Sequence, residues 1–329
     1  MADAPIPFVE LTDRVEQRRD GRRRRRQFPS PPESVQVERG RDLLTENDFP
    51  EHVTGFIPDG VRSSAHPAEL ERRFLPTRTF EHRVNPELKY ATCIFPPEDR
   101  FVFSDTSFPW RTCGKVGPSG ASGVMVGPRH LLTVSHGINW HTPTREEPWV
   151  ADWLSFTPSA FDENAPFGTA VGTHVYWQHQ VVGPTVDSTE EQFDYVVVVL
   201  DQPIGEVTGW MGSRSYTDDW DGSNYWSHVG YPSDLGGGVR PIFIGDVALD
   251  GDDSEDDAHQ TMRHQGDVWP GQSGGPYFGW WDGEPWPRVV GVQSWELYED
   301  DARTIPLTNG ASGGASMVDL IIRARNDHP

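Results

Sequence analysis

The chain has 329 residues, of which 35% are hydrophobic and 11% aromatic, enough for one large or two small globular domains. It carries 28 Lys and Arg against 50 Asp and Glu, a net charge of −22. It contains no run of about eighteen apolar residues, the length that crosses a membrane as a helix. An acidic surface repels phosphate backbones and anionic lipids, so we expect neither a nucleic-acid partner nor a membrane.

The charge is unevenly distributed along the chain. Residues 1–92 hold 16 basic and 16 acidic residues, so the remaining 12 basic and 34 acidic residues lie in residues 93–329. The first region has arginine runs at 18–19 and 22–26, frequent Pro and little periodicity. It predicts a largely irregular N-terminal arm or pro-segment, with a localisation signal, a nucleic-acid tail or a processing site as alternatives for the basic run.

From Ser122 onward, short apolar runs alternate with Gly- and Pro-rich turns. The runs that we expect to be strands are 123–126, 129–134, 153–156, 170–177, 195–200, 225–231, 241–249, 275–281 and 289–295. Many short strands with such turns predict an all-β sandwich or barrel. Residues 316–325 open with a Ser-x-x-Asp pattern and end in cations, which predicts a C-terminal helix over about residues 315–326.

A serine among glycines lies late in the chain. Residues 271–276 read GQSGGP, so Ser273 is exposed beside bare backbone amides. The N–H groups of Gly271 and Ser273 can converge on one oxygen, which is the geometry of an oxyanion hole. A glycine-rich turn between two strands is the alternative interpretation of this segment alone.

A serine hydroxyl needs a base and a group that orients the base. An apolar strand runs into His136, and Asp194 precedes the buried run at 195–200. The order His, Asp, Ser is one of the known triad orders. The rival bases are His130, His259 and His264, and the rival carboxylates are Asp187 and Asp201, neither of which opens a buried strand.

Together these segments resemble the chymotrypsin-like serine proteases, and more closely their glutamyl-endopeptidase (V8-like) branch. Residues 133–136 (TVSH) stand where that family has Thr-Ala-x-His, residues 193–197 stand for its Asp strand, and residues 271–276 stand for its nucleophile turn. Weaker matches are at 99–100, 105–106, 109–111, 229–232 and 291–295. The likeness covers roughly residues 98–325.

The resemblance implies two six-stranded antiparallel barrels in a protease domain at 93–329, the first at about 98–205 and the second at about 206–313. His136 and Asp194 would come from the first barrel and Ser273 from the second. The implied function is a serine endopeptidase with polypeptide substrates and no metal or cofactor, which we expect to be a monomer. The family is typically secreted, but residues 1–5 lack the features of a secretory signal, so the compartment stays open.

The resemblance also implies a substrate pocket. Its lining would be Asp267, Val268, Gln293, Ser294, Trp295 and Glu296. Asp267 stands where a trypsin keeps its Arg/Lys-binding carboxylate, although the V8-like pattern also has an Asp there. Val268 and Gln293 replace the Thr and His that bind a substrate carboxylate, and Glu296 stands where Gly is usual. We therefore expect a preference for basic or uncharged residues over glutamate.

Three further features leave alternatives open. Gln272 precedes the nucleophile where trypsin-type zymogens have an Asp, so activation by a newly cut N-terminal amine is not expected. Cys93 and Cys113 are either a disulfide or two buried thiols. The acidic residues 250–257 are a candidate calcium loop, but their spacing is not that of an EF-hand, which favours a solvated loop.

Other function classes explain less of the sequence than a protease does. A catalytically silent protease homologue that binds proteins is the main alternative, although it would usually have lost a triad residue. An HtrA-like protease would need a peptide-binding module after Ser273, for which too little chain follows. An α/β-hydrolase esterase would need the order Ser, Asp, His.

Overall fold

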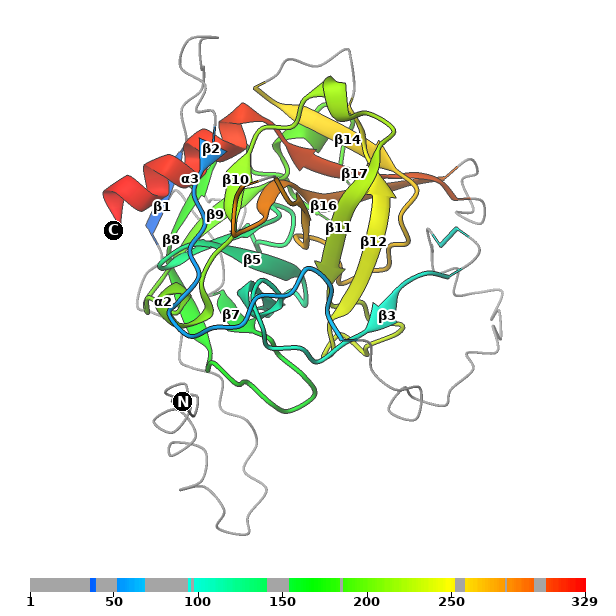
Figure 1. Cartoon of the computed structure of the whole chain (residues 1–329). Helices are drawn as coiled ribbons and strands as arrows, with labels where there is room; N and C mark the ends of the chain where they lie inside the picture. The colour runs from blue at the N-terminus through cyan, green and yellow to red at the C-terminus, as the bar shows by residue number, and fades with distance from the viewer. Residues whose placement is uncertain are drawn as a thin grey trace.

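The computed structural model describes residues 36–39, 52–68, 94–95, 98–140, 154–183, 186–251, 258–281, 283–298 and 306–329. Two largely antiparallel sheets lie side by side, with most strands of the first (teal to green) on the left of Figure 1 and most strands of the second, among them β11, β12, β14 and β17, on the right. A helix follows the last strand. The all-β fold class and the C-terminal helix that the sequence predicted are confirmed.

The first sheet contains a closed six-stranded barrel. Its strands are β4 (Cys113–Gly117), β5 (Ser122–Gly127), β6 (His130–Thr133), β7 (Ser155–Pro158), β8 (Ala170–Trp177) and β9 (Val196–Leu200). They pair in the order β7-β4-β5-β6-β9-β8, and the β7–β8 pairing closes the ring. A further strand, β1 (Gln36–Arg39), pairs in parallel with β8.

Strand β9 of this barrel is buried on both faces. Val196 and Val198 of β9 pack inside the barrel, whereas Val197 and Val199 pack on the side that holds the C-terminal helix. A strand with both faces covered has a continuous apolar run rather than an alternating one. The Val-rich run at 195–200 therefore predicted this strand correctly, and Asp194 lies at its mouth.

The second sheet has more strands but does not close. Its strands are β2 (His52–Val53), β3 (Phe101–Val102), β10 (Gly212–Arg214), β11 (Asn224–Gly230), β12 (Ile242–Ala248), β13 (Asp250–Gly251), β14 (Gln260–His264), β15 (Pro276–Gly279), β16 (Arg288–Tyr298) and β17 (Pro306–Gly313). The order is β13-β14-β17-β16-β15-β11-β12-β3, with β10 paired to β16 and β2 paired to β10.

The expected second closed barrel is therefore corrected to a half-barrel sheet. Among the described residues, β12 and β14 do not pair with each other. The edge of β12 pairs instead with β3 at Ile242 and Phe243. Only β13, which follows β12 after Leu249, reaches β14. The contact between these two parts of the sheet is therefore limited to the short β13.

In the part of the chain that the structure describes, the helical segments are η2 (Trp110–Thr112), η3 (Glu191–Phe193), α2 (Gly205–Thr208), η4 (Asp218–Trp220) and α3 (Ala315–Asp327). Within the described residues no helix is long and apolar enough to cross a membrane.

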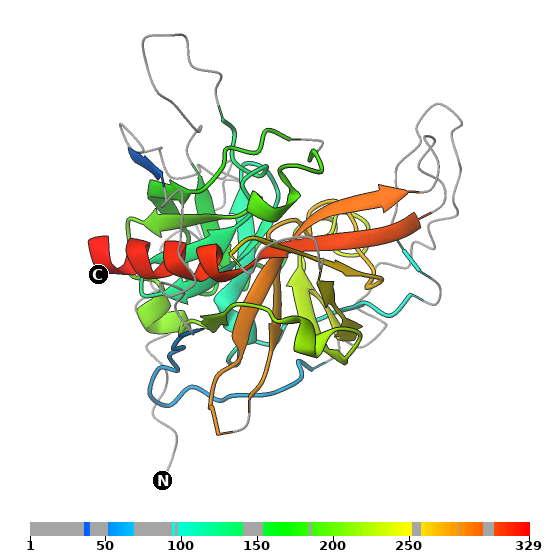
Figure 2. The ribbon, with the colours of Figure 1, turned by 90° about the horizontal axis from the view of Figure 1, so that it is seen from above.

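The C-terminal helix α3 runs on directly from β17 and lies along the first sheet (Figure 2). Met317, Leu320, Ile321 and Ala324 are fully buried there, at the spacing of one helix face. The predicted Ser-x-x-Asp cap is wrong: Gly314, with φ 99°, is the N-cap, and no side chain caps the helix. A glycine tolerates this left-handed backbone conformation, so the strand can turn directly into the helix.

Part of the expected irregular arm lies against the body. β2 pairs with β10, and Phe56 stacks on Trp210 with ring centroids 4.5 Å apart. The domain boundary at residue 92 stays a prediction. Cys113 is a buried free thiol, and burial raises its pKa to about 12, so the structure favours the thiol alternative. Cys93 and residues 252–257 of the candidate calcium loop lie outside the described residues.

Candidate active site

His136 and Asp194 meet at the ends of two paired strands. β6 and β9 are neighbours, with Thr133 opposite Val196, so the residues just after β6 and just before β9 lie together. Asp194 Oδ1 accepts a hydrogen bond from the backbone N–H of His136 at 2.8 Å, and its Oδ2 lies 2.6 Å from Nδ1 of the ring. The carboxylate therefore fixes both the position of His136 and the nitrogen that carries its proton, leaving Nε2 as the other ring nitrogen.

A third polar residue joins this pair from the second sheet. Ser294 on β16 donates its hydroxyl hydrogen to Asp194 Oδ2 at 2.5 Å. The sequence placed Ser294 in the substrate pocket and did not anticipate this bond. In the sequence Ser294 follows the apolar run at 289–292, but this position does not indicate the partner.

The charges of the pair are mutually stabilised. Burial works against an ionised Asp194, but the charge of His136, hydrogen bonds from its ring and backbone, and the Ser294 hydroxyl outweigh it and lower the pKa of the carboxyl. Burial likewise opposes the imidazolium, yet the charge and hydrogen bond of Asp194, followed by the charge of Glu296, raise the pKa of His136. His136 is therefore a base whose protonated form is stabilised by the fixed carboxylate of Asp194.

The turn that carries Ser273 is held against the strand that leads to His136. The Ser273 carbonyl accepts the N–H of Ser122 at 2.7 Å, and the Gly274 N–H donates to the Gln293 carbonyl at 2.8 Å. Gly274 has φ 81°, and a Cβ there would collide with Thr133 Oγ1. Only glycine allows this close approach. Among the described residues, no hydrogen bond joins Ser273 Oγ to His136.

Two amides of this turn are left without an acceptor. The N–H groups of Gly271 and Ser273 make no hydrogen bond within the described part of the chain, although the neighbouring amides do. Those neighbours donate as follows: Gln272 to Trp269, Gly274 to Gln293, and Gly275 to Gln272. Gly271 has φ 108°, and a Cβ there would collide with the Tyr231 carbonyl. The predicted oxyanion pair is thus the pair that could still bind an oxygen.

The residues expected to line the pocket differ in what they contact. Asp267 faces the backbone, since its oxygens accept the N–H of Phe95 at 2.6 Å and of Asp99 at 3.3 Å. Val268 and Trp295 are buried, at 2% and 8% exposure.

The Gln293 side chain has its polar atoms engaged inside the protein. Its Oε1 accepts the Tyr277 hydroxyl at 2.8 Å and lies 3.0 Å from Nε2 of His264, and its Nε2 donates to the Trp295 carbonyl at 3.1 Å. Burial lowers the pKa of His264 to about 3, so this imidazole is neutral. The negative charge of Glu296 reaches this group of residues. Burial is the main cause of the raised pKa of Tyr277, and the charge of Glu296 is the second cause.

The rival acids and bases have other partners. His130 lies 3.1 Å from the Ala324 carbonyl, and burial lowers its pKa to about 4. His259 contacts Ser316. Asp187 and Asp201 accept local hydrogen bonds, from Thr189 and from the backbone of Val171. Asp194 is the carboxylate that contacts His136.

Comparisons with known proteins find proteases among the similar proteins. No protein-family model matches the chain. A glutamyl endopeptidase of Bacillus licheniformis is 25% identical over 183 residues, which are 54% of this chain and 51% of the relative. A Bacillus subtilis protein named extracellular metalloprotease is 25% identical over 199 residues, 58% of each chain. The chain thus spans about half the length of these curated relatives.

A solved structure of a Glu endopeptidase in complex with MPD matches with a TM-score of 0.53 at 19% identity, over 71% of this chain and 99% of that one. The chain is similar in sequence to a glutamyl endopeptidase and has the fold of the solved Glu endopeptidase, which is a chymotrypsin-like fold. The predicted likeness to the V8-like serine proteases is confirmed at this level. The assignment of the triad and of the substrate pocket rests on contacts between residues within this chain.

Proposed function

We propose that the protein is a serine endopeptidase that acts through His136, Asp194 and Ser273. The observation that carries the proposal is the hydrogen-bonded His136–Asp194 pair, which lies beside a serine turn with two unpaired amides. The protease names of the relatives support the same class of reaction.

The proposed reaction is acyl transfer to Ser273. His136 Nε2 takes the hydroxyl proton while Ser273 Oγ attacks the peptide carbonyl carbon, and the electron pair of the carbonyl moves onto its oxygen. The N–H groups of Gly271 and Ser273 stabilise that oxyanion. Asp194 stabilises the imidazolium, which gives its proton to the amide nitrogen. The carbonyl then re-forms, the C–N bond breaks, the amine leaves, and the acyl group stays on Ser273 Oγ.

Deacylation repeats the same steps with water. His136 takes a proton from a water molecule as the water attacks the acyl carbonyl, and the new oxyanion lies between the same two amides. Collapse of this intermediate releases the acid product, and the proton returns from His136 to Ser273. The enzyme is regenerated without any further group.

The pocket supports cleavage after basic or uncharged residues rather than after glutamate. The Gln293 side chain is hydrogen-bonded within the protein through both Oε1 and Nε2, and His264 is neutral, so neither offers a cation to a substrate carboxylate. Glu296 contributes a negative charge close to His136. A carboxylate entering this pocket would meet repulsion, whereas an ammonium or guanidinium group would be attracted.

The test is cleavage of internally quenched peptides that differ only at the residue before the scissile bond, with Arg, Gln or Glu there. The proposal predicts that the wild-type protein cleaves the Arg and Gln peptides faster than the Glu peptide. It also predicts no cleavage by Ser273→Ala and strongly reduced cleavage by His136→Ala. Cleavage of the Glu peptide alone would overturn the proposed preference, and equal cleavage by Ser273→Ala would overturn the proposed nucleophile.

A further inference from the structure

A buried arginine contacts the residue that precedes the nucleophile. Arg100 lies just before β3, and its side chain is 0% exposed. Its Nη1 donates to Gln272 Oε1 at 2.8 Å. Its remaining nitrogens bind two carboxylates: Nε and Nη2 donate to Glu98 at 2.8 and 2.7 Å, and Nη2 also donates to Asp234 at 2.6 Å.

These two carboxylates keep Arg100 charged. Burial disfavours the guanidinium, but the hydrogen bond to Glu98 and the charge of Asp234 outweigh it and raise the pKa of Arg100. The ion pairs neutralise the buried charge, as a buried cation requires. The bond to Gln272 is additional, since an uncharged amide is not needed for neutralisation.

Gln272 passes this contact on to the nucleophile turn. Its side chain is buried, and Oε1 also accepts the backbone N–H of Trp269 at 3.0 Å. Its Nε2 donates to the carbonyl of Asp267 at 3.2 Å. One side chain therefore ties Arg100 to two points of the chain that leads into Ser273.

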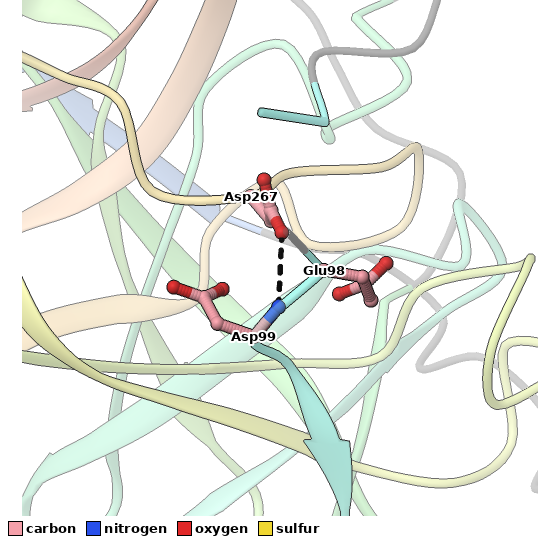
Figure 3. Close-up of side chains that lie close together, drawn as sticks. All are labelled: Glu98, Asp99 and Asp267. Atoms are coloured by element: carbon pink, nitrogen blue, oxygen red, sulfur yellow. Dashed lines mark hydrogen bonds between the residues drawn. The ribbon is translucent and has the colours of Figure 1, made fainter. Parts of the chain in front are cut away.

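A second contact fastens the same N-terminal segment to the same turn. The Asp267 carboxylate accepts the N–H of Phe95 and of Asp99, and Figure 3 shows the bond from Asp99. Glu98, Asp99 and Asp267 also form a cluster of carboxylates. Two of the three are engaged in the contacts described above, Glu98 with Arg100 and Asp267 with the backbone, so we assign the cluster to this bracing.

We propose that Arg100 is a positioning residue that holds the nucleophile turn in its active geometry through Gln272, as an internal cation within the uncut chain. This proposal rests on the proposed function. The residue before the nucleophile is neutral here, so it accepts a hydrogen bond from a fixed guanidinium and needs no newly formed terminal amine. The segment that contains Arg100 thus completes the catalytic site.

The physical consequence concerns the oxyanion pair. The Ser273 N–H belongs to the peptide group between Gln272 and Ser273, so pinning the Gln272 side chain fixes this unpaired amide directly and the Gly271 amide through the neighbouring residue. Such donors act mainly on the transition state, and loss of one donor reduces kcat by about 10²–10³. Loosening of the turn should lower kcat more than it raises KM.

The experiment compares full-length Arg100→Gln with wild type and with Arg288→Gln. Arg288 is a matched control, because its side chain is 2% exposed and binds Glu284 and the Val53 carbonyl away from the turn. We expect Arg100→Gln to lower kcat by roughly 10²-fold with little change in KM. We expect Arg288→Gln to leave both unchanged. A Gln272→Met variant keeps Arg100 and its carboxylates but removes the acceptor, and it should reproduce the loss.

The proposal predicts that each single variant and the Arg100→Gln/Gln272→Met double variant lose the same factor in kcat, because the two residues act through one contact. A purely structural role for Arg100 does not predict this equality. Unchanged kcat in Gln272→Met, or losses that add in the double variant, would overturn the proposal. Gln272→Met also decides the matter if Arg100→Gln does not fold.

Amide hydrogen exchange separates this proposal from the proposed function. Arg100→Gln should speed exchange at the Gln272, Gly274 and Gly275 amides, whereas Arg288→Gln should not. If wild type is inactive but this faster exchange is seen, the brace stands and the protease function fails. If wild type is active and exchange and kcat are unchanged in Arg100→Gln, the brace alone fails.

Discussion

Ser294 donates a hydrogen bond to the same Asp194 oxygen that faces the His136 ring. Ser294 comes from the second sheet, whereas Asp194 and His136 come from the first. The orientation of the carboxylate is therefore set from both sheets. The geometry of the site therefore depends on how the two sheets are placed relative to each other.

Ser294→Ala should lower kcat/KM by about 10- to 100-fold. A hydrogen bond to a charged group contributes roughly 1.5–3 kcal/mol, and its loss leaves the carboxylate less firmly held. Steady-state kinetics on a quenched peptide measures this loss. Ser213→Ala is the control, since that hydroxyl is buried without a partner in the described residues, and its kinetics should not change. Equal rates for wild type and Ser294→Ala would contradict the role of Ser294.

Asp194→Asn should lower kcat by about 10⁴-fold, because an amide neither holds the required tautomer of His136 nor stabilises its cation. KM should change much less, since Asp194 is buried behind the imidazole. The matched control is Asp201→Asn, whose carboxylate binds the backbone of Val171. A comparable loss in the control, or wild-type kcat in Asp194→Asn, would show that Asp194 does not orient the base.

The pH dependence should reveal the charges around His136. Because the folded-state pKa of His136 is raised above the ordinary 6.5, the midpoint of the acid limb of kcat/KM should lie above pH 6.5. Removing one of the charges that raise the pKa, in Glu296→Gln, should move that limb to lower pH. Glu190→Gln should leave it in place, since Glu190 contacts His179 instead. An identical profile in wild type and Glu296→Gln would rule out this coupling.

Asp267 should make stability fall with rising pH. Burial, followed by repulsion from Glu98 and Asp99, raises the pKa of this carboxyl to about 7 against hydrogen bonds from the backbone. The folded state then binds more protons than the unfolded state between about pH 4 and pH 7, so the free energy of unfolding decreases across that window. Urea unfolding at several pH values measures the slope, and Asp267→Asn should flatten it. A constant difference between wild type and variant from pH 4 to pH 8 would refute this assignment.

The sequence anticipated what local pattern determines. The short apolar runs between turns, among them the run at 195–200, predicted most of the strands, and the predicted strand at residues 170–177 coincides with β8. Local pattern failed where a distant partner decides. Ser294 and Asp194 are 100 residues apart, and Arg100 and Gln272 are 172 apart, so neither contact has a signal in its own neighbourhood.

Two errors have the same origin. In the second sheet β12 reaches β14 only through the short β13, and β3 pairs with β12 across about 140 residues of sequence, which no periodicity shows. The cap at Ser316 was inferred from a pattern that is valid at a free helix start. Here β17 enters the helix through Gly314, and the Ser316 hydroxyl contacts His259 instead.

The most direct test of the central claim is covalent labelling of the full-length protein with a fluorophosphonate, followed by mass spectrometry of the modified peptide. The account predicts one adduct per chain, on Ser273, in wild type and none in Ser273→Ala. It also predicts labelling slowed by orders of magnitude in His136→Ala. An unlabelled wild-type protein, or an adduct on another residue, would contradict the proposal that Ser273 is the nucleophile of a serine endopeptidase.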